Sequence, residues 1–168
     1  MRASDVTLEA PGRSISALLL CAGIGSRLRP LTDRWPKCLM PVRGVPLLAY
    51  WLDALQRAGI DRILVNGHHH ASAVQSFVEL PNYAARVRFV HEPQLLGTAA
   101  TLRENVEFFE GRPVLMIHAD NLVDVDLQEF INFHACERPS GTDLTMMTFD
   151  STDPKSCGIV ECDDRGVV

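Results

Sequence analysis

Two kinds of segment alternate along the chain, short apolar runs and longer stretches with an apolar stripe. The short apolar runs are typical of strands that are buried on both faces of a sheet. The longer stretches place apolar residues at helical spacing and therefore predict helices. We expect strands at residues 15–21, 62–66, 87–91 and 113–118, and helices at residues 46–58, 71–80, 98–109 and 127–138.

Two further strands are expected near the end of the chain, at residues 143–149 and 158–162, the second beside a turn at Asp163–Gly166. Strands that alternate with helices form right-handed βαβ units and a parallel sheet. The predicted fold is a three-layer α/β/α sandwich with a mostly parallel, Rossmann-like sheet. The length predicts one domain over residues 1–168, in which residues 1–14 form a flexible lead-in.

Composition narrows the class of protein. With 46% hydrophobic and 22% charged residues, the chain has the make-up of an ordinary folded domain. A net charge of −5 argues against a nucleic-acid partner, and we expect no membrane partner because no apolar run is long enough to span a bilayer. The five cysteines are irregularly spaced, which favours reduced thiols in a cytoplasmic protein. The run His68–His70 is expected to be a solvated loop rather than a metal site.

Ligands of parallel α/β sheets bind beyond the carboxyl ends of the strands. This rule selects the loops after Cys21, after His91 and after His118. The first of them is a Gly- and Pro-rich loop at residues 22–44, and we call its part at residues 22–37 the first loop. Glycines such as Gly23 and Gly25 let backbone N–H groups face an anion, while Arg27 and Lys37 add positive charge for a polyphosphate. The loop matches neither the Rossmann fingerprint nor a P-loop.

The order of residues in this loop resembles the signature of the sugar-1-phosphate nucleotidyltransferases, also called NDP-sugar pyrophosphorylases. The resemblance extends over nearly the whole chain, which corresponds to the N-terminal catalytic part of that family. It implies that the loop wraps a nucleoside triphosphate, with Arg27 on the departing pyrophosphate and Lys37 on the reacting phosphate. The nucleotide-binding residues implied in this loop are Ala22, Gly23, Gly25, Ser26 and Arg27. The residues that carry the match are Gly23, Gly25, Arg27, Leu28, Pro30, Leu31, Thr32, Pro36 and Lys37.

The same resemblance assigns roles in the two later loops. The segment that contains Glu92, Gly97 and Thr98 would meet the nucleobase, with Thr98 as the N-cap of the next helix. The carboxylate of Glu92 can accept the paired N–H groups of guanine. A glutamate at this position is explained equally well by pairing with a local Arg or by solvation. Asp120 would hold Mg²⁺ as a cofactor and, with Arg27 and Lys37, complete the catalytic set.

A fourth segment, Cys157–Glu161, resembles the family strand that holds sugar hydroxyls, which implies sugar binding by Gly158 and Glu161.

The predicted reaction joins an NTP and a sugar-1-phosphate to give an NDP-sugar and pyrophosphate, with a preference for GTP and mannose- or heptose-1-phosphate. Two alternatives remain open: a non-catalytic nucleotide-binding or regulatory domain of this fold, and a phosphocholine-type nucleotidyltransferase. The sequence also leaves open whether the chain assembles into a homo-oligomer. Because the family continues beyond the point where this chain stops, we expect a fragment that is truncated at its C-terminus.

Overall fold

The computed structural model describes residues 15–168, which divide into two compact units. The first unit ends at Leu127, and the second comprises Gln128–Val168. Each unit is described by itself. The predicted lead-in at residues 1–14 lies outside the described residues, and a single domain over residues 1–168 stays a prediction.

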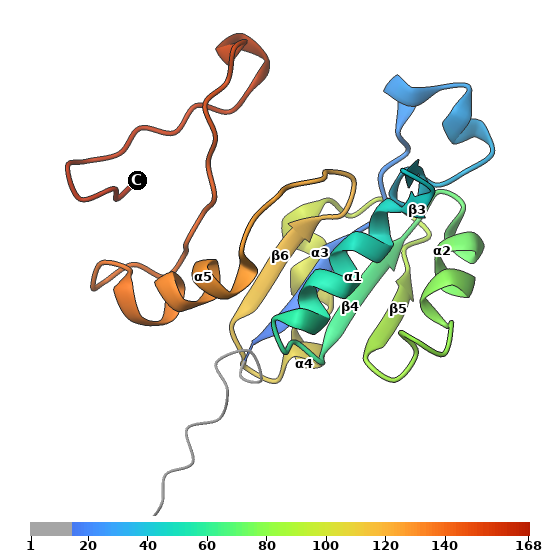
Figure 1. The fold of residues 1–168 in the computed structure, drawn as a ribbon, viewed down its shortest axis with the longest axis horizontal. Helices are drawn as coiled ribbons and strands as arrows, with labels where there is room; N and C mark the ends of the chain where they lie inside the picture. The colour runs from blue at the N-terminus through green and yellow to red at the C-terminus, as the bar shows by residue number, and fades with distance from the viewer. Residues whose placement is uncertain (1–14) are drawn as a thin grey trace, which may run out of the picture. The chain divides into compact units, whose positions relative to one another are not determined.

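Four parallel strands form the central sheet of the first unit (Figure 1). They lie in the order β5-β4-β1-β6. Because β1 pairs with a neighbour on each side, residues 16–19 are completely buried. The four predicted buried strands and the parallel sheet are thus confirmed, with bounds β1 (Ser16–Leu20), β4 (Ile63–Gly67), β5 (Val87–His91) and β6 (Val114–His118).

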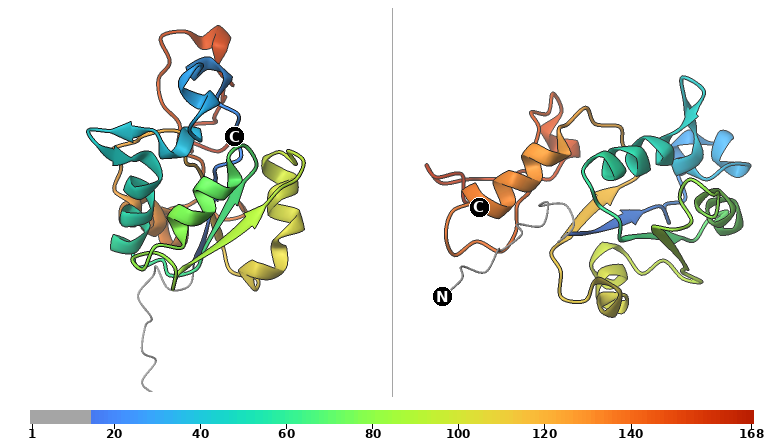
Figure 2. Two further views of the ribbon diagram at one scale, coloured as in Figure 1. Left: turned by 90° about the vertical axis from the view of Figure 1, so that its right-hand side faces the viewer. Right: turned by 60° about the horizontal axis from the view of Figure 1, so that its bottom comes forward.

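Helices cover both faces of this sheet, as Figure 2 shows. α1 (Leu47–Arg57) and α2 (Ala71–Val78) lie on one face, while α3 (Thr98–Glu104) and α4 (Val106–Phe109) lie on the other. The chain passes from β1 to β4 and β5 before it returns to β6, so right-handed crossovers place the two helix pairs on opposite faces. The three-layer prediction is confirmed. All four strands end at one edge of the sheet, where the candidate loops begin.

The core of the first unit is apolar on both sides of the sheet. Leu18 of β1 lies opposite Leu64 of β4, and Phe109 of α4 packs against the pair. On the other side, α1 presents Leu52 and Leu55, which are almost completely buried. Burial of such side chains from several elements is the main stabilising contribution to the unit.

Two local features differ from the predicted elements. A short antiparallel hairpin, β2 (Pro41–Val42) and β3 (Val45–Pro46), precedes α1, and strands of two residues are too short to produce a periodic pattern. The predicted helix 98–109 is broken at Asn105, where the backbone leaves helical geometry and Asn105 Nδ2 donates to the carbonyl of Thr101 at 2.8 Å. Asparagine breaks helices in this way because its amide competes for backbone groups.

The second unit contains little regular structure. α5 (Leu127–Asn132) begins at the last residue of the first unit and continues as a π-helical turn at Phe133–Glu137, which confirms the helix predicted at residues 127–138. The turn at Asp163–Gly166 is confirmed by a hydrogen bond from the Gly166 N–H to the Asp163 carbonyl.

The strands predicted at residues 143–149 and 158–162 are wrong for this structure. Neither segment pairs with another segment within residues 15–168. Alternating apolar residues favour an extended backbone, but a strand also requires a hydrogen-bonded neighbour. Leu144 and Phe149 consequently remain 74% and 83% exposed.

None of the helices within residues 15–168 has the length and apolar character that a membrane crossing requires.

Phe109 provides a test of the core. We expect Phe109→Ala to lower the free energy of unfolding by about 4 kcal/mol, because it leaves a cavity against Leu18 and Leu64. Val106→Ala is a matched control from the same helix, since Val106 is 60% exposed, and should change stability by less than about 0.5 kcal/mol. Urea unfolding followed by circular dichroism measures both; equal effects would contradict this packing.

Candidate active site

The first loop, residues 22–37, leaves the buried end of β1 and folds back on itself. Ala22 is buried, whereas Gly23 is exposed. Gly25 has a left-handed backbone with φ of 68°, and a Cβ at this position would lie 2.8 Å from Cγ2 of Thr32 and 3.2 Å from Cβ of Lys37. Backbone conformation and space therefore both require glycine at position 25.

Ser26 and Arg27 lie on an exposed 3-10 turn, Ser26–Leu28. The guanidinium of Arg27 makes no hydrogen bond or ion pair within the described part of the chain, so its donors are available to a ligand. Arg29 differs, because its Nε lies 3.3 Å from Oδ1 of Asp33 in an exposed ion pair. The geometry of the loop thus leaves Arg27 free for an anion and uses Arg29 locally.

Lys37 and Asp120 are brought together from positions far apart in the sequence. Lys37 Nζ donates to Asp120 Oδ2 at 2.6 Å, and both side chains are partly exposed, at 24% and 31%. Lys37 belongs to the 3-10 turn Lys37–Leu39, and Asp120 follows β6. The ion pair therefore joins the first loop to the end of an edge strand, where solvent and ligands reach it.

Asp120 also allows a test of the predicted metal site. No group of three or more His, Cys, Asp or Glu side chains within residues 15–168 is arranged to hold a metal ion. Mg²⁺ commonly uses one or two carboxylates and takes its other ligands from phosphates and water. Asp120 fits that pattern, since its Oδ1 accepts no hydrogen bond within the described residues. A magnesium ion at this position would depend on the nucleotide for most of its ligands.

A buried polar network joins the ends of β1, β4 and β5, and the sequence did not reveal it. Asn66, the fourth residue of β4, is 2% exposed. Its Oδ1 accepts the N–H of Cys21 at 2.7 Å, and its Nδ2 donates to Glu92 Oε1 at 2.9 Å. Thr101 Oγ1 donates to the same Glu92 oxygen at 2.6 Å. A polar residue near the end of an apolar strand was the signal that could have identified this network.

This network changes the interpretation of Glu92. The side chain is 3% exposed, and its Oε1 already accepts two hydrogen bonds inside the protein. Glu92 is thus neither solvated nor paired with an arginine, and the hypothesis that it reads guanine loses its basis. Its carboxylate instead ties the segment at residues 92–98, which we call the base loop, to β4 and α3.

The other two residues predicted in the base loop are accessible. Gly97 is exposed, with φ of 80°, and a Cβ there would meet nothing within 4 Å. Thr98 is the first residue of α3, and Gly97 occupies the N-cap position without a side-chain cap. The predicted capping role of Thr98 is therefore wrong, whereas contact of Gly97 and Thr98 with a nucleobase stays a prediction.

Cys21 and Cys38 are two buried thiols that contact each other. A hydrogen bond with Cys38, together with burial, raises the pKa of Cys21 well above its ordinary value. The negative charge of Asp120 acts in the same direction. Cys21 is therefore a neutral thiol rather than a nucleophilic thiolate. All five cysteines are free, and all lie within the described residues.

The run His68–His70 is not a solvated loop, contrary to the prediction. All three residues are half-buried, and each imidazole lies within hydrogen-bonding distance of a backbone carbonyl. The acceptors are Glu92 for His68, and Thr32 for both His69 and His70. This run consequently contacts two of the predicted nucleotide-binding loops.

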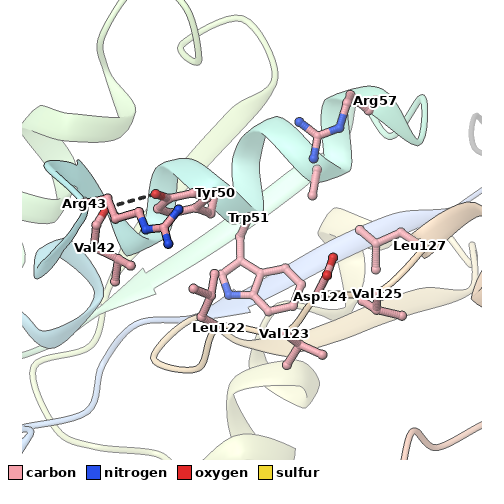
Figure 3. Close-up of a pocket in the computed structure, with 11 residues that line it drawn as sticks. Val42, Arg43, Tyr50, Trp51, Arg57, Leu122, Val123, Asp124, Val125 and Leu127 are labelled. Carbon is pink, nitrogen blue, oxygen red and sulfur yellow. Dashed lines mark hydrogen bonds between the residues drawn. The ribbon is translucent and has the colours of Figure 1, made fainter.

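A hollow of about 590 Å³ lies against α1 (Figure 3). The Tyr50 hydroxyl donates to the carbonyl of Val42 at 2.9 Å, and Trp51 Nε1 donates to the carbonyl of Asn121 at 2.7 Å, which anchors the loop after Asp120. None of the predicted site residues lines this hollow. Its lining residues are Val42, Arg43, Tyr50, Trp51, Ala54, Arg57, Leu122, Val123, Asp124, Val125 and Leu127.

Gly158 and Glu161 belong to the second unit, where both are exposed. The extended segment that contains them forms no strand. Their role in sugar binding stays a prediction.

The close approach at Gly25 yields a stability prediction. Gly25→Ala should lower the free energy of unfolding by about 1–3 kcal/mol, because it combines a left-handed backbone with a clash against Thr32. Gly23→Ala is the matched control, since a Cβ at Gly23 meets nothing within 4 Å, and it should change stability by less than about 1 kcal/mol. Urea unfolding of both variants is the measurement, and the prediction fails if Gly23→Ala is the more destabilising change.

The Asn66 network yields a second stability prediction. Asn66→Ala should cost about 3 kcal/mol of unfolding free energy, because the buried Glu92 carboxylate and the Cys21 N–H each lose a partner. Gln75→Ala removes an exposed hydrogen bond to Glu79 and should cost less than about 0.5 kcal/mol. If thermal or urea unfolding places the two variants at the same stability, the network does not hold the sheet edge together.

Comparison with known proteins identifies the family. The family model described as "Nucleotidyl transferase" matches residues 16–168. The chain is 29% identical over 163 residues to the catalytic subunit beta of mannose-1-phosphate guanylyltransferase from Drosophila melanogaster, covering 95% of this chain and 43% of that protein. It is also 29% identical over 170 residues to UTP–glucose-1-phosphate uridylyltransferase from Synechocystis sp., covering 92% of this chain and 42% of that protein.

The fold has a counterpart among solved structures. A putative glucose-1-phosphate thymidylyltransferase from Bacillus anthracis superposes with a TM-score of 0.65 at 23% identity, covering 70% of this chain and 49% of that one. The chain spans less than half the length of the curated relatives that it matches. The family match covers nearly all described residues and includes the first loop, the Lys37–Asp120 pair and the base loop, so the chain belongs to the nucleotidyl transferase family.

Proposed function

We propose that this chain carries the nucleotide-binding part of an enzyme that joins an NTP to a sugar-1-phosphate, giving an NDP-sugar and pyrophosphate. The observation that carries the proposal is the 2.6 Å contact between Lys37 Nζ and Asp120 Oδ2 at the carboxyl edge of the sheet. The contact brings together a cation and a carboxylate, the groups that a triphosphate and its metal ion require, and the loop that carries Lys37 also carries Arg27, whose guanidinium makes no hydrogen bond or ion pair within the described residues. The names of the similar proteins support a sugar-1-phosphate as acceptor.

In the proposed reaction, an oxygen of the sugar-1-phosphate forms a bond to the α-phosphorus of the NTP. The bond from that phosphorus to the bridging oxygen breaks, and pyrophosphate leaves with the electron pair. Both substrates are anions, so the protein must align them and offset their charge rather than supply a nucleophile. This requirement agrees with a site that contains neutral Cys21 and no activated nucleophile among the residues assigned to it.

The residues of the first loop have separate tasks in this scheme. Gly23 and Gly25 bring backbone N–H groups to the phosphates, because no side chain intervenes at either position. Arg27 stabilises the departing pyrophosphate through its planar set of donors. Lys37 exchanges part of its contact with Asp120 for the reacting phosphate, and the ammonium group offsets the charge that moves during transfer.

Magnesium is the proposed cofactor. Asp120 would hold it with the substrate phosphates, and the ion would supply positive charge against the phosphate oxygens.

GTP with mannose- or heptose-1-phosphate is the proposed substrate pair. Support comes from the guanylyltransferases among the similar proteins, which include one from Mycobacterium tuberculosis. Glu92 no longer contributes to this choice. A cytoplasmic location, a role in polysaccharide biosynthesis and assembly into a homo-oligomer complete the proposal.

Lys37 and Asp120 provide the test of the chemistry. Lys37→Met and Asp120→Asn should each lower kcat/KM by about a hundredfold or more, because each removes a charge that acts on the reacting phosphates. Lys155→Met is the matched control, since Lys155 is the only other lysine and is exposed. The assay measures pyrophosphate release in the longest chain that carries these residues, with GTP, UTP, dTTP and CTP against mannose-, heptose- and glucose-1-phosphate and phosphocholine.

The outcomes separate the alternatives. Release of pyrophosphate only with GTP and mannose- or heptose-1-phosphate supports the proposed substrate pair. Release only with phosphocholine identifies a phosphocholine-type nucleotidyltransferase. Tight NTP binding without release under any combination favours a regulatory domain. Equal activity of Lys37→Met and Lys155→Met would contradict the proposed mechanism.

A further inference from the structure

Three consecutive imidazoles form an unusual link at the end of β4. His68 Nδ1 lies 2.8 Å from the carbonyl oxygen of Glu92. His69 Nε2 and His70 Nε2 lie 2.9 Å and 3.2 Å from one oxygen, the carbonyl of Thr32. The run thus contacts the base loop with one ring and the first loop with two.

The chemistry of these contacts fixes where the imidazole protons are. A carbonyl oxygen can only accept, so each contacting ring nitrogen must carry a proton and donate it. His69 and His70 therefore both carry a proton on Nε2, and both donate to the two lone pairs of a single oxygen. The two rings lie close together, with centroids 4.0 Å apart and planes inclined by 55°.

The backbone at His70 explains how two neighbouring side chains reach the same oxygen. In an extended segment, successive side chains point to opposite sides. His70 instead has a left-handed backbone, with φ of 52° and ψ of 38°, at the residue before α2. This conformation is uncommon for a residue with a Cβ, and such strain persists only where the surrounding contacts hold it.

Thr32 transmits this contact to the phosphate-binding residues. It is 1% exposed, and its hydroxyl donates to the carbonyl of Gly25 at 2.9 Å. Gly25 in turn packs so closely that a Cβ there would lie 2.8 Å from Thr32 and 3.2 Å from Lys37. Thr32 is therefore bonded to and closely packed against Gly25, and Gly25 lies against Lys37.

We propose that His69 and His70 are positioning residues, which hold the first loop in its phosphate-binding shape through the carbonyl of Thr32. The inference rests on the proposed function, because it assigns these residues to nucleotide binding by that loop. Neither imidazole needs to touch the nucleotide. Their loss leaves Thr32 free to move, and Gly25 and Lys37 then no longer present one fixed arrangement to the phosphates.

The test compares two double variants of the 168-residue chain. His69→Leu/His70→Leu removes both donors, whereas His69→Gln/His70→Gln keeps an N–H group near the position of Nε2. With GTP, UTP and Mg²⁺ in calorimetry, the Leu pair should weaken binding of the preferred nucleotide by about tenfold, because two hydrogen bonds are lost. The Gln pair should restore binding to within about threefold of the unchanged chain.

A second readout does not depend on nucleotide. Amide hydrogen exchange of residues 23–37, followed by mass spectrometry without ligand, should be faster in the Leu pair and close to normal in the Gln pair. His91→Leu is the control for loss of an imidazole, since His91 is exposed and no hydrogen bond or ion pair joins its side chain to the first loop within the described residues. It should leave both readouts unchanged.

The outcomes distinguish this inference from the proposed function. If the unchanged chain binds neither nucleotide, the proposed function fails, while exchange of residues 23–37 still tests the role of the histidines. Unaltered exchange in the Leu pair, or a Gln pair as impaired as the Leu pair, would overturn the inference. If the Leu pair does not fold, the single changes His69→Leu and His70→Leu replace it, and each should accelerate exchange in the same residues.

Discussion

The amide of Asn66 occupies the point where β1, β4 and β5 reach the same edge of the sheet. It accepts a hydrogen bond from the Cys21 N–H and donates one to the Glu92 carboxylate, and Thr101 satisfies the same carboxylate from α3. These bonds matter for stability because they are buried. A buried polar group left without a partner would lower the free energy of unfolding. The first loop directly follows Cys21 and the base loop begins at Glu92, so the starting points of both depend on one side chain.

The loops that leave this edge are held by contacts between distant segments. Lys37 contacts Asp120 after β6, and Thr32 contacts the histidine run after β4. Trp51 holds the loop after Asp120 through the carbonyl of Asn121. Arg27, in contrast, extends into solvent without a partner among the described residues. The site is therefore preorganised at its base and open where a triphosphate would bind, which suits catalysis by alignment and charge.

The sequence predicted the sheet because its strands are apolar on both faces. This pattern can be recognised in the sequence without knowing which strands are neighbours. The order of residues in the first loop and after β6 also selected Lys37 and Asp120, which the structure brings together, while the roles of these residues and of Arg27 stay predictions. It could not predict that Asn66 binds Glu92 or that His69 and His70 meet at Thr32, because these contacts depend on three-dimensional proximity rather than on local pattern. The strand expected at residues 143–149 failed for a related reason, since strand formation requires a partner segment.

A crystal structure of the chain with Mg²⁺ and a non-hydrolysable GTP analogue tests the central claim most directly. The account predicts that the triphosphate lies on the first loop, with its oxygens accepting hydrogen bonds from the N–H groups of Gly23 and Gly25 and from the side chains of Arg27 and Lys37. It also predicts that the metal ion contacts Asp120. A triphosphate bound elsewhere, for example in the hollow along α1, with the Lys37–Asp120 contact unchanged, would contradict it.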